Sequence, residues 1–255
     1  MKISVITVAF NSASTIADTL TSVARQTHPE IEHLVIDGQS TDDTVSVVEA
    51  HRHPCLKISS EPDDGIYDAM NKGLRRACGE VIGFLNADDF YADDEVLAKI
   101  AHAFQNPAVD ACYADLVYVT HDNSRVVRYW KSKPFVNGDF AKGWCPAHPT
   151  FYVRKSVMER LGLFDQSYKL AADVEFMMRY LERGQVRAVY IPHVLVRMRV
   201  GGATNKSWAN IVRQNKEIFA ALRKNSVPFS RMLFAVHKLV SRLNQFAVGY
   251  IRRYQ

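Results

Sequence analysis

The chain has 255 residues, of which 47% are hydrophobic and 23% are charged, and its net charge is +5. This composition is typical of a folded chain with a normal core and argues against disorder. No run of about 18 uninterrupted apolar residues occurs, so we expect no membrane-spanning helix. The four cysteines form no CxxC pair and no histidine cluster accompanies them, so we expect reduced thiols, no zinc site and a cytoplasmic protein.

Strand and helix patterns alternate along the first half of the chain. Residues 2–10 form a β-branched apolar run typical of a strand buried on both faces, and residues 12–26 place apolar side chains at helical spacing behind polar capping residues. Alternation of this kind predicts parallel strands joined by right-handed crossovers, and therefore an α/β fold. The further segments are strand patterns at 33–38, 56–60 and 80–89 and helix patterns at 40–51 and 65–78.

Polar residues follow the ends of successive predicted strands: Asn11, Asp37, Asp64, Asp88 and Asp89. Ligands of open α/β sheets bind beyond the carboxyl ends of the strands, so we expect these side chains to converge on one crevice. Carboxylates gathered in one crevice repel each other unless a cation offsets them. A divalent metal bridging the acids to phosphate oxygens would do so. Taken singly, each acid could also be a helix cap or a turn residue.

Several segments resemble a known family. The stretches "ISVITVAFN", "VIDGQSTDDT", "EPDDGIYDAMNKG" and "GFLNADD" resemble the nucleotide-sugar-binding segments of family 2 glycosyltransferases, which are inverting enzymes with the GT-A fold. The later "HPTFYVRKSVMERLGLFDQSYKLAADVEFMMR" resembles their acceptor-side segment. The resemblance covers roughly residues 3–202 and is strongest to bacterial enzymes that build exopolysaccharide or O-antigen repeat units. It implies a GT-A, mostly parallel sheet flanked by helices.

The resemblance also implies donor-binding residues. Thr7, Ala9 and Asn11 match the end of the first strand, where the family packs the nucleoside. Asp37 matches the carboxylate that accepts a hydrogen bond from uracil, and Asp64 matches an acid near the base and ribose. A UDP-sugar is therefore the expected donor.

The metal motif departs from the family pattern at one position. Asp88 matches the metal-binding aspartate of the DxD motif and Asp89 follows it, but the first position is Asn86, which brings an amide oxygen and no charge. The resemblance implies Mn²⁺ or Mg²⁺ as cofactor. Asp173, in "AADVEF", matches the catalytic base at the start of a helix, and Glu175 is the competing base.

The expected chemistry needs one general base and one cation that stabilises the leaving group. Transfer of a sugar from a nucleotide diphosphate breaks the bond between C1 and a phosphate oxygen, so negative charge grows on the leaving group and a metal at Asp88 would stabilise it. A carboxylate such as Asp173 would take the proton of the attacking acceptor hydroxyl. A single displacement of this kind inverts the anomeric centre.

Four further residues are candidates for acceptor or diphosphate contacts. His148 lies between two prolines and is equally consistent with a structural turn. His193 could be a polar residue at a strand end. Arg197 and Arg199 share a strand face by their spacing and could bind phosphates, or could be solvated charges.

The chain divides by pattern into a catalytic domain, residues 1–205, and a basic extension, residues 206–255. Within the domain, residues 1–105 form the nucleotide-sugar half and 106–205 the acceptor half. The extension carries ten Lys and Arg against the single acid Glu217, so its net charge is +9 and that of the first 205 residues is −4. Its apolar residues recur at helical spacing. They are Phe229, Met232, Leu233, Val236, Leu239, Val240, Leu243, Phe246, Ala247 and Tyr250.

Two interpretations of this amphipathic helix remain open. In the first, the helix packs on the catalytic body or on a partner. In the second, it lies on an anionic membrane that contains a lipid-linked saccharide acceptor. The protein would then be peripheral on the inner face of the cell membrane. No nucleic-acid-binding motif accompanies the basic residues, so we expect no nucleic-acid partner.

The sequence supports other functions less well than it supports a glycosyltransferase. A dinucleotide-dependent oxidoreductase needs G-x-G-x-x-G after the first strand, and "AFNSAST" contains no glycine. A nucleotidyltransferase would need a glycine-rich, basic loop near the N-terminus, which is also lacking. A non-catalytic protein that binds a sugar nucleotide or serves as a scaffold stays open, because Asn86 weakens the metal motif.

Overall fold

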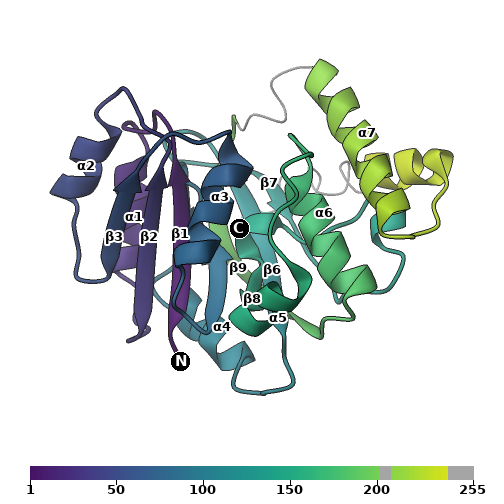
Figure 1. Ribbon diagram of the computed structural model, residues 1–255, viewed down its shortest axis with the longest axis horizontal. Coiled ribbons are helices and arrows are strands. Elements are labelled where there is room, and N and C mark those ends of the chain that lie inside the picture. Colours follow the sequence, from purple (N-terminus) through teal and green to yellow (C-terminus); the bar gives the residue numbers. More distant parts are fainter. Residues whose placement is uncertain (202–207, 241–255) are drawn as a thin grey trace.

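The computed structural model of the chain describes residues 1–201 and 208–240. A mixed sheet with the strand order β3-β2-β1-β4-β8-β6-β9-β5 forms its centre, and β7 pairs with β6. Helices α3, α5 and α6 pack against one face of this sheet, with α7 packed on α6, and α1, α2 and α4 pack against the other face (Figure 1). The GT-A α/β architecture expected from the sequence is confirmed.

The first half alternates strands and helices as the sequence predicts. The parallel registers bring Ala9 opposite Asp37 and Asp37 opposite Ser60, so the carboxyl ends of three strands meet at one edge of the sheet. The predicted fourth strand is shorter than expected, because a turn closed by a hydrogen bond from Asp89 N to Asn86 O follows it. The elements are β1 (Ile3–Ala9), α1 (Ile16–Ala24), β2 (Ile31–Asp37), α2 (Thr44–Ala50), β3 (Leu56–Ser60), α3 (Ile66–Arg76) and β4 (Val81–Phe84).

The second half adds antiparallel strands. Strand β8 lies antiparallel between β4 and β6, whereas β9 runs parallel to β6 and antiparallel to β5. Helix α6 continues into a π-helical turn, Arg179–Arg183. The elements are β5 (Asp89–Tyr91), α4 (Val96–Ala103), β6 (Ala111–Val119), β7 (Val126–Trp130), β8 (Tyr152–Arg154), α5 (Lys155–Leu161), α6 (Ala172–Met178), β9 (Ala188–Arg199) and α7 (Trp208–Lys224), with short 3₁₀ turns at Phe140–Lys142 and His148–Thr150.

An aromatic stack fixes α6 against the sheet. The ring centroids of Phe164 and Phe176 lie 4.4 Å apart, and those of Phe176 and Tyr180 lie 4.1 Å apart. Phe164 also meets Phe84 of β4 edge to face. Burying each such ring stabilises the fold by roughly 1.5–3 kcal/mol. The start of α6 is therefore held next to the carboxyl end of β4.

The described part of the basic extension packs on the catalytic body. Ile218, Ala221 and Leu222 of α7 join the core cluster that contains α6, and residues 231–240 form a further helix whose Phe234 is 3% exposed in the same cluster. The opposite side of this helix is exposed, with Met232 at 77%. The expected stripe positions Leu243, Phe246, Ala247 and Tyr250 lie outside the described residues. Among the described residues, no helix combines the length and apolar character needed to cross a membrane.

Candidate active site

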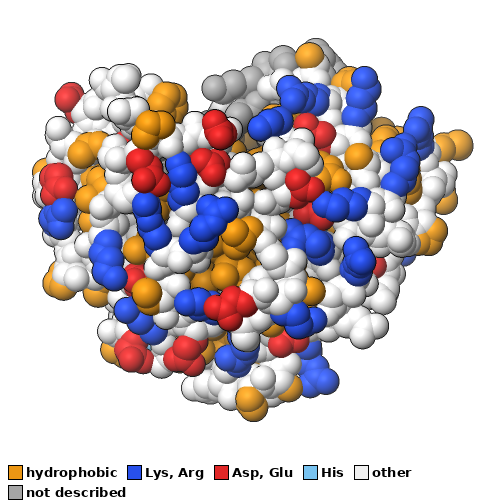
Figure 2. Space-filling model, viewed as in Figure 1, with side chains coloured by type: hydrophobic (Ala, Val, Ile, Leu, Met, Phe, Trp, Pro, Cys, Tyr) orange, Lys and Arg blue, Asp and Glu red, His pale blue; other side chains and the backbone are white. Residues whose placement is uncertain are grey.

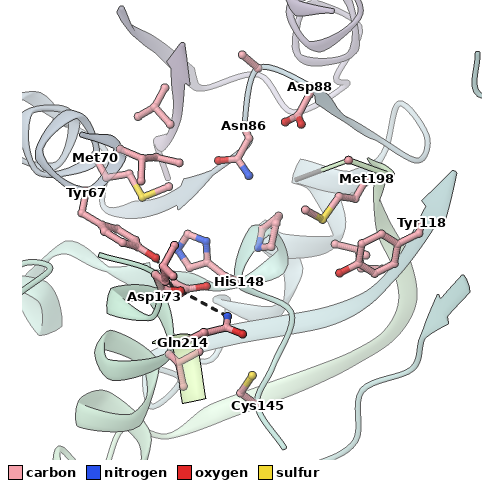
Figure 3. Close-up of a pocket in the computed structure, with 18 of the residues that line it drawn as sticks. Tyr67, Met70, Asn86, Asp88, Tyr118, Cys145, His148, Asp173, Met198 and Gln214 are labelled. Atoms are coloured by element: carbon pink, nitrogen blue, oxygen red, sulfur yellow. Dashed lines mark hydrogen bonds between the residues drawn. The ribbon is translucent and has the colours of Figure 1, made fainter. Parts of the chain in front are cut away.

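A cavity of about 1140 Å³ lies at the edge where the strands of the first half end. Side chains from both halves of the chain and from α7 line it, and Figure 3 shows Asn86, Asp88, His148 and Asp173 among them. One side is formed by the end of β1, the start of α3 and the turn after β4. Its other side is formed by β6, β7, residues 144–149 and α6. The convergence predicted from the strand ends is therefore observed in outline, with a different set of acids.

The end of β1 contributes Ala9 and Asn11 to the cavity. Asn11 has φ 49°, and its Oδ1 accepts a hydrogen bond of 2.9 Å from Thr41 N, so its amide ties the loop after β2 to the cavity rim. Thr7 is fully buried and its hydroxyl pairs with His33 Nε2 at 2.9 Å, away from the cavity. The structure thus places two of the three predicted β1 residues at the site.

Asp37 holds the loop that follows β2. Its fully buried carboxylate accepts hydrogen bonds from Ser40 N at 3.0 Å, Ser40 Oγ at 2.5 Å and Ser60 Oγ at 2.6 Å. It does not line the cavity. Asp37 lies at the end of a strand, as predicted, but its carboxylate is hydrogen-bonded to Ser40 and Ser60.

Asp63, which the sequence analysis missed, lines the cavity where Asp64 was expected. Asp64 is exposed and stands outside the lining, whereas Asp63 lies beside Gly38. A Cβ on Gly38 would come within 2.4 Å of Asp63 Oδ2, so a larger residue at position 38 would displace the Asp63 carboxylate from this place. The doubled acid in "EPDDG" was the available signal, but a loop has no periodicity from which to choose between its two members.

Asn86, Asp88 and Asp89 behave differently from one another. Asn86 and Asp88 line the cavity, and Asn86 Nδ2 donates a hydrogen bond of 3.1 Å to Asp89 Oδ2. Asp89 is fully buried outside the lining. Burial, and then the charge of Asp88, raise the pKa of Asp89 well above its ordinary value. Burial also raises the pKa of Asp88, and the nearby Arg199 offsets part of this effect.

The oxygen atoms at this turn fit a divalent cation that is bound mainly by the phosphates of a substrate. Within residues 1–201 and 208–240, no group of three or more His, Cys, Asp or Glu side chains is placed to hold a metal. Asn86 Oδ1, however, is buried without a hydrogen-bond partner next to the carboxylate-bearing turn. Mg²⁺ and Mn²⁺ prefer oxygen ligands, and Mg²⁺ is commonly bound through one or two carboxylates together with water and substrate phosphates. Asp88, with Asn86 beside it, matches that pattern.

Asp173 occupies the first turn of α6 and lines the cavity. Tyr67 of α3 donates its hydroxyl to Asp173 Oδ1 at 3.1 Å. His148 lies close by, stacked on Phe84 at a centroid distance of 5.4 Å. Burial lowers the pKa of His148, and the charge of Asp173 counters this only in part. A neutral imidazole and a phenol therefore flank the carboxylate.

The side of the cavity formed by β6 and β7 carries an aromatic wall that was not predicted from the sequence. The rings of Tyr118 and Trp130 stack at 6.4 Å with 8° between their planes, and the Arg128 guanidinium lies 4.7 Å and 5.4 Å from their centroids. All three side chains line the cavity, as does Trp144. Alternation in "VVRYW" placed Arg128 and Trp130 on one strand face, which was the available signal.

A family model described as Glycosyl transferase family 2 matches residues 4–166. The chain belongs to this family. The protein is thus a transferase, and membership favours an enzyme over the non-catalytic alternative. The matched segment contains β1, α3 and the turn after β4 and ends before α6, so it does not include Asp173.

Curated relatives agree with this assignment. An uncharacterized glycosyltransferase of Mycobacterium tuberculosis is 32% identical over 181 residues, which are 69% of this chain and 68% of that protein. A PGL/p-HBAD biosynthesis glycosyltransferase of Mycobacterium bovis is 29% identical over 209 residues, covering 79% and 78%.

Two solved structures share the fold. Staphylococcus aureus TarS 1-349 in complex with UDP-GlcNAc has a TM-score of 0.69 at 24% identity, covering 89% of this chain and 66% of that one. The mannosyltransferase PcManGT from Pyrobaculum calidifontis, in complex with GDP-Man and Mn²⁺, has a TM-score of 0.59 at 22% identity, covering 97% and 73%.

Glu175, the competing base, lies away from the cavity of the transferase. It is fully buried, and Arg179 Nε approaches its Oε1 at 3.1 Å while Lys224 Nζ lies 3.7 Å from it. Both cations would have to be displaced before this carboxylate could accept a proton from a substrate. Glu175 therefore joins α6 to the end of α7 and leaves Asp173 as the carboxylate of α6 in the cavity.

His193, Arg197 and Arg199 of β9 also stand outside the cavity lining of the transferase. His193 is exposed. Arg197 and Arg199 do share a strand face, because both guanidinium groups lie over the Phe90 ring, but Met198 between them is the residue that faces the cavity.

Arg199 is a structural residue in this arrangement. Its guanidinium donates to Asp88 O and His121 O, each at 2.9 Å, and contacts the carboxylate of Asp18. It therefore fixes the backbone at Asp88 and lies outside the cavity lining.

Proposed function

We propose that this transferase moves a sugar from a nucleotide diphosphate, with UDP as the expected nucleotide, to a hydroxyl of a saccharide acceptor with inversion at the anomeric carbon. The observation that carries the proposal is Asp173, a carboxylate held by Tyr67 within the same cavity as Asp88. Figure 3 draws Asp88 and Asp173 on opposite sides of this space. The complexes of TarS with UDP-GlcNAc and of PcManGT with GDP-Man and Mn²⁺ support a nucleotide-sugar donor.

The proposed base works through its free oxygen. Tyr67 donates to Oδ1 of Asp173, which orients the carboxylate and leaves Oδ2 for the acceptor hydroxyl. As that hydroxyl attacks C1 of the donor sugar, its proton passes to Asp173 and the bond from C1 to the diphosphate breaks. Burial lowers the pKa of His148, and in its neutral form this imidazole adds no positive charge that would stabilise ionised Asp173 and make it a weaker base.

The diphosphate is expected to lie beside Asn86 and Asp88. A divalent cation bound there would act as a Lewis acid that neutralises the charge developing on the leaving diphosphate. Asp88 would hold it as a carboxylate ligand and Asn86 through its free Oδ1. Asp89, whose carboxylate receives the Asn86 amide, would orient Asn86 from behind.

The acceptor is proposed to stack on the aromatic wall formed by Tyr118, Trp130 and Trp144. Aromatic faces suit the apolar faces of sugar rings, and few polar groups are then needed to fix orientation. Arg128, already seated over two of these rings, supplies a positive charge at the same wall. This arrangement supports a saccharide acceptor, which would lie across the cavity from the donor.

We further propose that the acceptor is lipid-linked and that residues 231–240 lie on an anionic membrane, as in the assembly of bacterial surface polysaccharide. One side of this helix exposes apolar residues, whereas its Phe234 and Lys238 line the cavity. Figure 2 shows Lys, Arg and hydrophobic side chains at the end of the molecule formed by α7 and this helix. Each surface-near cation contributes roughly 1 kcal/mol on an anionic leaflet. The exposed apolar residues are Met232, Leu233, Val236, Leu239 and Val240.

Two measurements test this function. Turnover with a panel of UDP-sugars and a lipid diphosphate acceptor should give a product of inverted anomeric configuration. Thermal shifts with UDP, GDP and TDP in the presence and absence of Mn²⁺ should rank UDP with metal first, because a ligand of the folded state raises stability by mass action. No turnover with any donor, or equal shifts with all three nucleotides, would contradict the assignment.

The membrane step has its own test. Co-sedimentation with vesicles of anionic and of neutral lipid should show binding to the anionic vesicles alone. The double variant Met232→Ser/Leu239→Ser should lose this binding, while Val189→Thr, an exposed apolar site on β9, should retain it. Equal binding by both variants would refute the role of residues 231–240.

A further inference from the structure

Helix α7 carries two polar side chains on the side that packs against the catalytic body. Ile218, Ala221 and Leu222 are buried on this side, and Gln214 and Glu217 lie about one turn earlier on it. The Glu217 side chain is only 15% exposed. A largely buried carboxylate must be paired to be tolerated, so its partners indicate what it does.

Those partners are backbone groups of one short segment. Glu217 Oε2 accepts hydrogen bonds from Leu170 N at 2.7 Å and from Ala171 N at 3.0 Å. Gln214 Nε2 donates to Leu170 O at 3.4 Å. The Leu170 residue is therefore held by α7 at both its N–H and its C=O. The other Glu217 oxygen, Oε1, receives Arg213 Nε at 3.3 Å.

The held segment leads directly into the helix of the proposed base. Helix α6 has Ala171 at its N-cap position and receives no side-chain capping bond from its own sequence. Ala171 O accepts the first helical hydrogen bond, from Glu175 N at 2.9 Å, so the residue held by Glu217 also starts the helix. Asp173 follows two residues later. Without Glu217, no side-chain cap would satisfy the backbone N–H groups where the chain enters this turn.

We propose that Glu217 is a positioning residue for Asp173: by fixing residues 170–171 from α7, it places the carboxylate against Tyr67 and the acceptor hydroxyl. This inference rests on the proposed function, in which Asp173 is the base. A shift of about 1 Å in a reacting group can cost on the order of 100-fold in rate, so a remote anchor of this kind affects turnover strongly.

The test is a double-mutant cycle with turnover expressed per UDP-binding site, which removes any inactive fraction from the rate. Glu217→Ala should lower kcat on the order of 100-fold with UDP affinity unchanged. Glu217→Gln should restore most of the rate, because its carbonyl oxygen can accept both backbone N–H groups. If Glu217 acts through Asp173, the double variant Glu217→Ala/Asp173→Asn should be no slower than Asp173→Asn alone.

Arg213→Gln is the matched control, because it removes the partner of Oε1 and leaves the two bonds to Oε2 in place. It should keep near-normal turnover. If Glu217→Ala does not fold, Glu217→Asp, which shortens the side chain by one carbon and keeps its charge, replaces it in the same cycle.

Two results would overturn the inference while leaving the base assignment intact. One is normal turnover per binding site in Glu217→Ala. The other is an equal further loss when Glu217→Ala is added to Asp173→Asn, which marks a general structural effect. Normal turnover of Asp173→Asn itself would remove the base, and with it both this inference and the proposed mechanism.

Discussion

Tyr67 of α3 and Asp173 of α6 are 106 residues apart in the chain, and the phenolic hydroxyl of the first donates to Oδ1 of the second at 3.1 Å. This bond joins the two sides of the cavity, which come from the first and the second half of the chain. Burial, followed by the charge of Asp173, raises the pKa of Tyr67 well above its ordinary value, so the phenol keeps its proton and remains a donor at working pH. The carboxylate is thereby oriented without being neutralised.

Tyr67→Phe is expected to lower turnover about tenfold, because the loss of one hydrogen bond to a charged group corresponds to roughly 1.5 kcal/mol of orientation. The ring contact with Phe164, at a centroid distance of 5.7 Å, would remain and the fold should be preserved. Steady-state kcat measured beside UDP affinity checks this. An unchanged kcat would show that the hydroxyl does not orient the base.

Asp88→Ala is expected to abolish the gain in UDP affinity that Mn²⁺ provides, since Asp88 is the carboxylate of the turn that lines the cavity. Titration calorimetry of UDP with and without Mn²⁺ measures this gain. Asn86→Asp is the companion variant, and its added carboxylate should strengthen the metal dependence. Undiminished metal-dependent affinity in Asp88→Ala would exclude the residue as a metal ligand.

Phe234→Ala should destabilise the transferase by about 3 kcal/mol, because the ring is buried in the cluster that contains α6 and packs edge to face on Phe219 at 5.0 Å. Met232→Ala, on the exposed side of the same helix, should stay within about 0.5 kcal/mol of the wild type. Urea unfolding of the two variants compares them. Equal stabilities would mean that residues 231–240 do not belong to the folded body.

Stability should fall in acid through Glu32. Burial alone would raise the pKa of this carboxylate, but hydrogen bonds from Cys78 N, Lys57 and Ser4 outweigh it and bring the pKa to about 2, against 4.5 in the unfolded chain. A depressed pKa stabilises the fold at pH above 4.5, and the contribution is lost as the pH falls toward 2. After solvent screening, we expect a loss on the order of 1 kcal/mol between pH 5 and pH 3.

Unfolding free energies of the wild type and of Glu32→Gln across this range measure the contribution. The variant should be less stable at pH 7 and should show a flatter dependence on pH. Parallel curves would assign the acid sensitivity to other carboxylates.

The first half of the fold was accessible from the sequence because its signals are local. Buried strands read as apolar runs, and the polar residues that end them mark one edge of the sheet by topology alone. The sequence does not show whether a polar side chain at a strand end points into the cavity or binds a neighbouring loop. Asp37 lies at the predicted strand end, but its carboxylate accepts hydrogen bonds from Ser40 and Ser60. No pattern in the sequence predicts these hydrogen bonds.

The parts that were missed depend on contacts between distant segments. The aromatic wall needs β6 and β7 to pair before Tyr118 meets Trp130, and Arg199 needs the turn at Asp88 to be folded before it can bind its backbone. Helical spacing predicts the apolar stripe of the extension, but this stripe does not include Phe234. The burial of Phe234 depends on packing against the catalytic body.

Turnover and UDP affinity of Asp173→Asn, measured on the same preparation, test the central claim most directly. Asparagine keeps the shape and can still accept the Tyr67 hydrogen bond, but it cannot take a proton from the acceptor. The account predicts an unchanged fold and UDP affinity with a loss in kcat on the order of 100-fold or more, the usual scale for removal of a general base. Near-normal turnover, with or without a modest change in melting temperature, would contradict it.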